Sequence, residues 1–438
     1  MATSGSSSST PGTSGAKAAI SNPTATLATA TSRRSGTPWN RPEPEDMRLS
    51  KSRTENGGDR DLRVRVVGHP FAPIGMGEHI RSVWRALREA GIDAQIVDVH
   101  EMQRDPDPRL VDELAPYIAK NLGDGVNIFC VNGDEVEPTL RLLGPRHAMA
   151  PGSRNVIYPA WELELYPESW ARQLMRFDEI WAASEFTRNA IAAAVTTPVA
   201  HMPLACEGRR RALRSRRHFG IGESAYVFLF AFDFLSYLER KNPFAAIEAF
   251  LLLLQSRPYA DVRLVIKTNN SEHRPDMKAR FDAAIAPLRD RVQVIDGTLR
   301  EPDMMALLWL CDAFLSLHRS EGFGFGLAEA MALGKPVIAT AYSGNMDFCT
   351  DETAFLVPYD MVAVHEGEYP FWEGQQWAAP DVAVAAQWMA QLVDDPASGR
   401  ARGDKARERL LADFSYLAVG QAYAERLSHL SVEGQPAS

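Results

Sequence analysis

Two glutamates, Glu321 and Glu329, bracket a run in which glycine alternates with phenylalanine, within the segment EGFGFGLAEAMALGKPVIAT of residues 321–340. The preceding DAFLSLH is typical of a buried strand, and LAEAMALG has the apolar spacing of a helix that ends at Gly334. Glycines at such a strand-to-helix turn let the backbone approach a ligand, and the unpaired amides of a helix start bind anions. Because carboxylates accept hydrogen bonds from hydroxyl groups, the turn is predicted to bind a sugar joined to a phosphate.

The two carboxylates are expected to hold different parts of that ligand. Glu329 lies a little more than two helical turns beyond Glu321, at a rise of about 1.5 Å per residue, so the pair cannot share a proton. The backbone amides predicted to meet sugar and phosphate oxygens are those of Gly322, Phe323, Gly324 and Phe325. The two phenylalanine rings are interpreted as packing residues rather than as stacking platforms. His318 and Arg319, just before Glu321, are expected to support it.

The spacing of the two glutamates resembles the Glu-x7-Glu signature of the retaining glycosyltransferases of family 4. Other blocks resemble the same family, in its order, from about residue 62 onward: PAWELELYPESW, FDEIWAASEFTRNAI, FDFLSYLERKNPFAAIEAF, LVIKTNN and GEYPFWEGQQWAAPDV. The resemblance implies the GT-B fold, in which two Rossmann-like domains face a cleft, and transfer of a sugar from a nucleotide sugar with retention of its α-linkage. It also implies that Glu321 lies beside the donor sugar, that Glu329 holds the ribose hydroxyls, and that the leaving phosphate helps to deprotonate the acceptor.

Arg240 and Lys241 stand where the strand YVFLFAFD is expected to run into a helix that begins at Pro243. Cations at a helix start oppose the helix dipole, which favours anion binding over a role as solvated surface charges. Fixed cations would stabilise the negative charge that collects on a departing diphosphate. Lys241 matches the phosphate-binding lysine of the family, whereas the arginine that usually precedes it is missing, so Arg240 is the expected substitute. Glu321, Lys241 and Arg240 are therefore the predicted catalytic residues.

Further candidates follow other predicted strands. Gly75 and Gly77 follow RVRVVG and are spaced as in a dinucleotide fingerprint, but the third glycine position is Ile80 and the match fails. Their loop is interpreted as binding the donor phosphate or the acceptor, or as a tight turn without a ligand. Glu162 follows NVIYP and could orient an acceptor or a donor hydroxyl. Lys267, in LVIKT, either adds positive charge near the nucleotide phosphates or has a structural role.

No metal ion or other cofactor is expected. The Asp-x-Asp pattern of Asp105 and Asp107 is the metal-ligand pattern of a different glycosyltransferase fold, but these residues alternate with prolines in a loop. Fixed cations and helix amides would neutralise the diphosphate instead, and the nucleotide sugar itself is a substrate.

The net charge of -9 over 438 residues argues against a nucleic-acid partner. The basic run RRRALRSRRH of residues 209–218 is interpreted as a solvated connector, with a phosphate or an anionic membrane surface as the alternative ligand. No apolar run is long enough to cross a bilayer, so any membrane contact would be peripheral. The four cysteines are scattered without a metal-ligand spacing, which favours buried thiols in a reducing cytosol.

The predicted fold class is α/β with two parallel-sheet, Rossmann-like domains, because two successive runs of short apolar strands alternate with amphipathic helices. Residues 1–60, rich in Ser, Thr, Ala and Gly, are expected to be a disordered tail, with an organelle transit peptide as the alternative. Residues 61–206 are assigned to an N-terminal domain on the acceptor side, and residues 207–400 to a C-terminal domain on the donor side. Residues 401–438 are expected to form C-terminal helices and a tail, which by resemblance return toward the first domain.

The expected function is that of a cytoplasmic glycosyltransferase that passes a sugar to a glycan or a polyprenyl-linked glycan. The resemblance is nearest to bacterial polysaccharide and lipopolysaccharide mannosyltransferases, which favours GDP-mannose as the donor. Three other classes stay open: a nucleotide-sugar epimerase, a dehydrogenase, and a degenerate sugar-nucleotide-binding module that regulates a partner enzyme. The epimerase would need more acid-base groups at the sugar, and the dehydrogenase would need a glycine in place of Ile80. The missing arginine supports the binding module.

Overall fold

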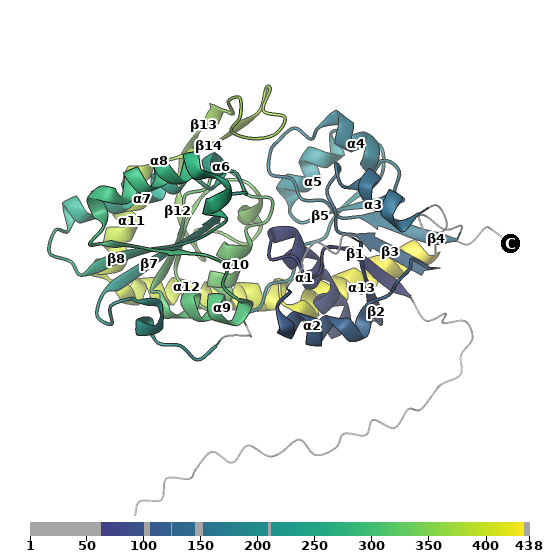
Figure 1. Cartoon of the computed structure of the whole chain (residues 1–438), viewed down its shortest axis with the longest axis horizontal. Helices are drawn as coiled ribbons and strands as arrows, with labels where there is room; N and C mark the ends of the chain where they lie inside the picture. The colour runs from purple at the N-terminus through teal and green to yellow at the C-terminus, as the bar shows by residue number, and fades with distance from the viewer. Residues whose placement is uncertain (1–62, 100–105, 124, 145–151, 209–211, 433–438) are drawn as a thin grey trace, which may run out of the picture. The chain divides into compact units, whose positions relative to one another are not determined.

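The computed structural model describes residues 63–99, 106–123, 125–144, 152–208 and 212–432. The expected tail of residues 1–60, the start of the basic run and Asp105 lie outside these ranges. Within them, the chain forms two six-stranded parallel sheets with helices packed around each (Figure 1). This architecture confirms the α/β class with two Rossmann-like halves.

The first sheet has the strand order β2-β1-β3-β4-β5-β6. Its strands are β1 (Val64–Gly68), β2 (Ala94–Asp98), β3 (Gly125–Phe129), β4 (Ser153–Ile157), β5 (Glu179–Ala182) and β6 (Val199–His201). The helical segments between them are α1 (Gly75–Glu89), α2 (Pro108–Leu114), η1 (Ala115–Tyr117), α3 (Val136–Leu143), α4 (Glu168–Leu174) and α5 (Glu185–Ala192). The strand order changes direction between β1 and β3, and in open α/β sheets ligands bind where the loops after such a pair of strands diverge.

The second sheet has the strand order β12-β11-β10-β7-β8-β9. Its strands are β7 (Tyr226–Asp233), β8 (Val262–Asn269), β9 (Val292–Asp296), β10 (Ala313–Ser316), β11 (Val337–Thr340) and β12 (Phe355–Val357). The helical segments here are η2 (Arg216–Phe219), α6 (Leu238–Lys241), α7 (Pro243–Ser256), η3 (Ser271–His273), α8 (Pro275–Ile285), η4 (Ala286–Leu288), α9 (Glu301–Leu310), α10 (Phe325–Ala332), η5 (Gly344–Asp347), α11 (Val382–Asp394) and α12 (Pro396–Asp413). The direction changes between β7 and β10, and the loops after these two strands carry the predicted catalytic residues.

The continuous apolar character of β7 follows from helices on both faces of the sheet. Val227 and Leu229 belong to one core cluster, together with residues of α9 and α10. Phe228 and Phe230 belong to a second cluster, together with residues of α7 and α11. Successive side chains of a strand point to opposite faces, so burial of both faces leaves no polar alternation along the strand.

Every strand expected from a short apolar run is present, but three strands were not predicted. These are β12 and the antiparallel pair β13 (Tyr359–Ala363) and β14 (Gln376–Pro380). β12 is apolar but only three residues long, and nearly all of β13 is exposed.

The last helix, α13 (Tyr416–Val432), packs against the first half of the chain beside α1 and β3 (Figure 1). The Tyr423 ring stacks on Trp181 at 5.0 Å, and its hydroxyl donates a 2.7 Å hydrogen bond to the Pro203 carbonyl. Gly420 permits this close packing, because a Cβ at its position would lie 2.0 Å from the Ala86 carbonyl oxygen. The return of the C-terminus to the first half, which the resemblance implied, is thus present.

Candidate active site

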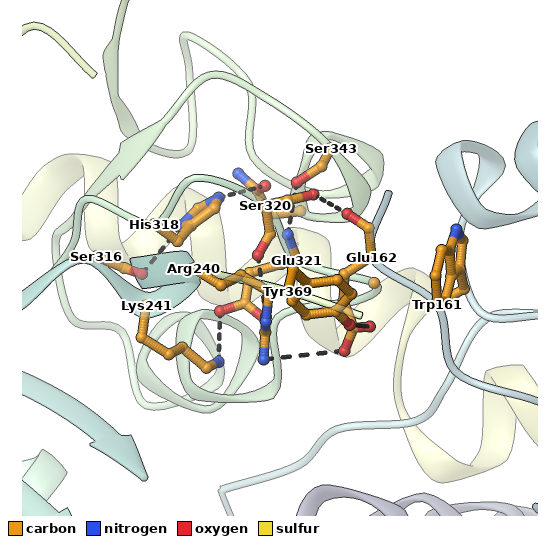
Figure 2. A network of polar contacts seen from close by, with 12 residues as sticks. Trp161, Glu162, Arg240, Lys241, Ser316, His318, Ser320, Glu321, Ser343 and Tyr369 are labelled. Atoms are coloured by element: carbon orange, nitrogen blue, oxygen red, sulfur yellow. Dashed lines mark hydrogen bonds and ion pairs between the residues drawn. The ribbon is translucent and has the colours of Figure 1, made fainter. Parts of the chain in front are cut away.

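Glu321 lies between the two cations that were predicted to accompany it (Figure 2). Lys241 donates a 2.5 Å hydrogen bond from Nζ to Glu321 Oε1. Arg240 donates 3.0 Å hydrogen bonds from Nη1 to Glu321 Oε2 and to the Ser320 carbonyl. The three predicted catalytic residues therefore form one contiguous, largely buried group.

Local backbone geometry sets the position of the two cations. They end α6, a single helical turn that lies between Tyr237 and Asn242, both with positive φ, at 61° and 55°. Asn242 caps α7 by accepting a hydrogen bond from an amide of its first turn, and donates from Nδ2 to the Leu317 carbonyl at 2.9 Å. A second tie is the 2.8 Å hydrogen bond from the Arg319 amide to the Arg240 carbonyl. Both bonds fix α6 to the segment after β10, which leads to Glu321.

The charges in this group are strongly coupled. Burial alone would raise the pKa of Glu321, but the charges of Lys241 and Arg240 outweigh it and lower that pKa to about 2. Burial lowers the pKa of Lys241, and Glu321 opposes this effect. Burial also acts to lower the pKa of Arg240, but Glu321 and Glu162 raise it above its ordinary value. The negative charges of Glu321 and Glu162 thus offset the positive charges of Lys241 and Arg240 within one site.

Glu162 joins the group from the first half of the chain. Its Oε1 lies 3.9 Å from Arg240 Nη2, and its Oε2 accepts a short hydrogen bond from the Tyr369 hydroxyl. The Ser320 hydroxyl donates to the Glu162 carbonyl. The predicted orienting glutamate therefore lies beside the predicted catalytic group, whereas Tyr369 and Ser320 were missed. Neither residue type signals a role by itself, and only the block GEYPFWEGQQWAAPDV pointed to the region of Tyr369.

The glycine-rich turn packs closely against protein rather than around open space. A Cβ at Gly322 would lie 2.8 Å from the Trp161 carbonyl oxygen, and Ser184 donates a 2.6 Å hydrogen bond to the Gly322 carbonyl. Gly324 has a φ of 97° and forms the N-cap of α10 without a side-chain cap. The turn therefore needs glycine both for close approach and for backbone conformation. Of the amides predicted to meet an anion, that of Phe325 begins α10, and no side chain caps this helix start.

The aromatic residues of this turn pack as expected. Phe323 is buried and contacts the rings of Phe325, Phe348 and Phe414 at 5.2, 5.3 and 6.2 Å. His318 supports the turn from behind, with Nε2 3.0 Å from Asn345 Oδ1 and Nδ1 3.0 Å from the Ser316 hydroxyl. Burial lowers the pKa of His318 below its ordinary value.

Glu329 has different surroundings from Glu321. It lines a small pocket with Glu78, Glu301, Cys206 and Tyr416, among other residues. Burial raises its pKa to about 8, and the charges of Glu78 and Glu301 add to this effect. The two glutamates therefore have different charged neighbours, and their binding of different parts of a ligand stays a prediction.

A buried arginine, Arg85, compensates the other carboxylates around this pocket. It forms ion pairs with Glu78 at 3.5 Å, with Glu113 at 3.1 Å and with Glu301 at 3.1 Å. Because Glu301 begins α9 in the second half and Arg85 lies on α1, this group ties the two halves together beside Glu329.

In the described ranges, no hydrogen bond or ion pair joins the remaining candidates, Gly75, Gly77 and Lys267, to the catalytic group. Gly75 begins α1, and Gly77 fits tightly in it, since a Cβ at Gly77 would lie 2.0 Å from the Ala72 carbonyl oxygen. Lys267 donates 2.8 Å hydrogen bonds to the Thr268 carbonyl and to Asn269 Oδ1, at the end of its own strand. Burial lowers the pKa of Lys267 to about 8. None of the contacts of Lys267 in the described ranges reaches Glu321, so its proposed part in phosphate binding stays a prediction.

The described ranges contain no group of three or more His, Cys, Asp or Glu residues arranged to hold a metal ion. Among the helices described, none is long and apolar enough to cross a membrane. The four cysteines are buried and unpaired, as their scattered positions predicted.

Comparison with known proteins relates this site to transferases. Residues 225–366, which contain Lys241, Glu321 and Glu329, match the family described as Glycosyl transferases group 1. Glycogen synthase of Mycobacterium tuberculosis is 30% identical over 129 residues, which are 30% of this chain and 27% of that protein. D-inositol 3-phosphate glycosyltransferase of Pseudarthrobacter chlorophenolicus is 31% identical over 132 residues, 30% of each chain. Each match thus spans less than a third of the relative's length.

Solved structures match over much more of the chain, at low sequence identity. HepE of Anabaena, crystallised with UDP and glucose, matches 84% of this chain and 100% of its own, with a TM-score of 0.62 and 14% identity. Sucrose-phosphate synthase of Thermosynechococcus elongatus matches 85% of this chain and 100% of its own, with a TM-score of 0.60 and 15% identity. The chain therefore has the GT-B fold, and its residues 225–366 carry a domain of the group 1 glycosyl transferases.

Proposed function

We propose that the protein is a retaining glycosyltransferase that moves a sugar from a nucleoside diphosphate sugar to a hydroxyl of a glycan or lipid-linked glycan. The observation that carries this proposal is the buried Glu321 between Lys241 and Arg240, at the start of α10 and within the segment that matches the group 1 glycosyl transferases. The Glu321 carboxylate could accept hydrogen bonds from the sugar hydroxyls of a donor. The two cations and the amides at the start of α10 could bind the diphosphate of the same donor.

The charge balance of the group supplies a mechanism. The two cations and the carboxylates of Glu321 and Glu162 offset one another, and an arriving diphosphate would add negative charge. Lys241 and Arg240 would then exchange part of their contact with Glu321 for phosphate oxygens, which frees Glu321 to accept a hydrogen bond from a donor hydroxyl. As the bond to the sugar breaks, charge grows on the phosphate, and fixed cations stabilise that state more than the ground state.

The other groups take the remaining parts of the substrates. Glu329 would hold the ribose hydroxyls, as the resemblance implies. The oxygen of Glu162 beside Arg240 would accept a hydrogen bond from a sugar hydroxyl near the reacting carbon. With no unpaired base assigned to the acceptor, its proton would pass to the departing phosphate. This route gives retention of configuration.

The donor is proposed only to the level of a nucleotide sugar. GDP-mannose was the initial expectation, but HepE was crystallised with UDP and glucose and with UDP-glucose, and the names of the relatives point to neither mannose nor lipopolysaccharide. We therefore propose UDP-sugars and GDP-mannose equally as candidate donors. A cytoplasmic location, with any membrane contact peripheral, is part of the proposal.

Release of nucleoside diphosphate by the purified protein tests the proposal. We expect turnover of one donor among UDP-glucose, UDP-N-acetylglucosamine and GDP-mannose, and an α-linked product from that donor by NMR. A sugar-nucleotide-binding module would bind a donor in calorimetry but release no diphosphate. An epimerase would return an epimer of the donor with its diphosphate still attached, and an inverted product would remove the retaining mechanism.

A further inference from the structure

The hairpin of β13 and β14 is the part of the second half that the proposed mechanism leaves without a role. Its two strands pair from Tyr359 with Pro380 to Ala363 with Gln376, and residues 364–375 form the loop at its end. The hairpin lies beside the catalytic group, because the Ala378 amide donates a 3.0 Å hydrogen bond to the Arg319 carbonyl, two residues before Glu321.

The loop of this hairpin is fastened to the segment that contains Glu162. Gln375, which is buried, donates from Nε2 to the Leu165 carbonyl at 2.6 Å and accepts from the Leu165 amide at 3.1 Å. The Phe371 ring packs edge-on against Trp170 at 5.2 Å. The loop therefore cannot shift without moving the connection between β4 and α4.

Tyr369 is the residue of this loop that reaches the site. Its side chain is buried among three aromatic rings, with centroid distances of 4.7 Å to Tyr237, 5.9 Å to Trp161 and 6.4 Å to Trp377. Its hydroxyl donates to Glu162 Oε2. Burial raises the pKa of Tyr369 well above its ordinary value, and the Glu162 charge adds to this effect, so the hydroxyl stays a donor at neutral pH.

The hydrogen bond from Tyr369 gives the two carboxylate oxygens of Glu162 different surroundings. Tyr369 occupies Oε2, whereas Oε1 faces Arg240 at 3.9 Å and accepts no hydrogen bond from any residue in the described ranges (Figure 2). A carboxylate held at one oxygen presents the other in a fixed direction. The fixed direction here is toward Arg240, which itself contacts Glu321.

We propose that Tyr369 is a positioning residue for the transfer reaction: its hydroxyl holds Glu162 Oε2, so that Oε1 accepts a hydrogen bond from a substrate hydroxyl beside Arg240 and Glu321. This inference rests on the proposed function. It gives the hairpin loop a part in the reaction, although Tyr369 touches no substrate. Its effect passes entirely through Glu162.

A double-mutant cycle with Tyr369→Phe and Glu162→Gln tests this assignment. Phenylalanine keeps the ring in its aromatic cluster and removes only the hydroxyl. The assay is diphosphate release from whichever of UDP-glucose, UDP-N-acetylglucosamine or GDP-mannose the wild-type protein turns over fastest. We expect Tyr369→Phe to lower kcat by about tenfold with little change in the donor KM, because it disorders a group that acts in the transition state. In the Glu162→Gln background the same change should alter kcat by less than about twofold.

The matched control is Tyr259→Phe, which makes the same chemical change at a fully exposed ring. That hydroxyl forms no hydrogen bond within the described part of the chain, so we expect kcat and the melting temperature to stay near wild type. An unchanged kcat in Tyr369→Phe overturns the proposal. So does an equal loss with and without Glu162, since a purely structural effect would be independent of that carboxylate. If the wild-type protein releases no diphosphate from any donor, the proposed function itself fails, and this inference fails with it.

Discussion

The ammonium of Lys241 lies 2.5 Å from the carboxylate of Glu321, although the two residues are 80 positions apart in the chain. A buried charge that loses its partner is costly, so each of these residues holds the other in place. Under the proposed function, the diphosphate of a donor would compete with Glu321 for Lys241. The ion pair would then take part in donor binding as well as in the fold.

Replacing Lys241 by alanine should lower donor turnover by about 100-fold or more, because the lost charge acts mainly as the phosphate departs. The fold should persist, since Arg240 still pairs with Glu321 at 3.0 Å. Steady-state diphosphate release and circular dichroism check the two parts. Lys278→Ala is the control, because Lys278 forms an ion pair with Asp282 on the surface. This change should leave both turnover and fold unaltered. Full activity in a folded Lys241→Ala protein would remove this lysine from the site.

Replacing Glu321 by glutamine should cost turnover to a similar extent. The amide keeps the shape of the side chain but replaces one oxygen acceptor by a donor, and it leaves Lys241 and Arg240 without their shared anion. The exposed Glu352→Gln is the matched control for the same chemical change, and its turnover should equal that of wild type. If Glu321→Gln retains wild-type kinetics, Glu321 has a structural role in the glycine-rich turn and no role in the reaction.

Glu329 should make stability depend on pH. Its pKa rises from an ordinary 4.5 to about 8 in the folded protein, so folding favours its protonated form. That stabilisation is fully present below about pH 4.5 and is lost as the pH rises through about 8. Because Glu329→Gln cannot ionise, its melting temperature relative to wild type should increase between pH 5 and pH 9. Thermal unfolding at several pH values checks this. A difference that is the same at every pH would show that Glu329 ionises normally.

Donor turnover should survive chelation. The diphosphate of the donor can be neutralised by a divalent cation or by fixed protein charges, and here Lys241, Arg240 and the amides of α10 are available. Diphosphate release in excess EDTA should stay within about twofold of the rate with added Mg²⁺ or Mn²⁺. A strict requirement for either ion would contradict the assignment of the phosphate site.

Local sequence patterns could bring Glu321, Lys241 and Arg240 together because all three lie on short strand-to-helix connections. The glycine run that carries Glu321 and the proline that follows Arg240 and Lys241 each mark such a connection, and parallel-sheet topology brings their loops to one edge. Tyr369 could not be found this way. Its partner Glu162 is 207 residues away, and the hairpin that carries it lacks the apolar run of a buried strand.

The glycines show a second limit of such predictions. Gly322 and Gly77 were interpreted through the space that a ligand needs, but in the folded chain the backbone of Trp161 approaches Gly322, and that of Ala72 approaches Gly77. A glycine signals close approach without saying what approaches. Glu329 was correctly separated from Glu321, but the acidic neighbours that raise its pKa come from α1 and α9, which no local pattern connects to it.

The return of α13 to the first half sets an order for the synthesis of this protein. A ribosome completes the strands β1 to β6 long before it makes Tyr423, which stacks on Trp181, and Gly420, which seats the helix against α1. Until then, the nascent first half carries an uncovered apolar surface around Trp181, and it cannot reach its final stability. A helix that follows the entire second half in the chain therefore completes the packing of the first half.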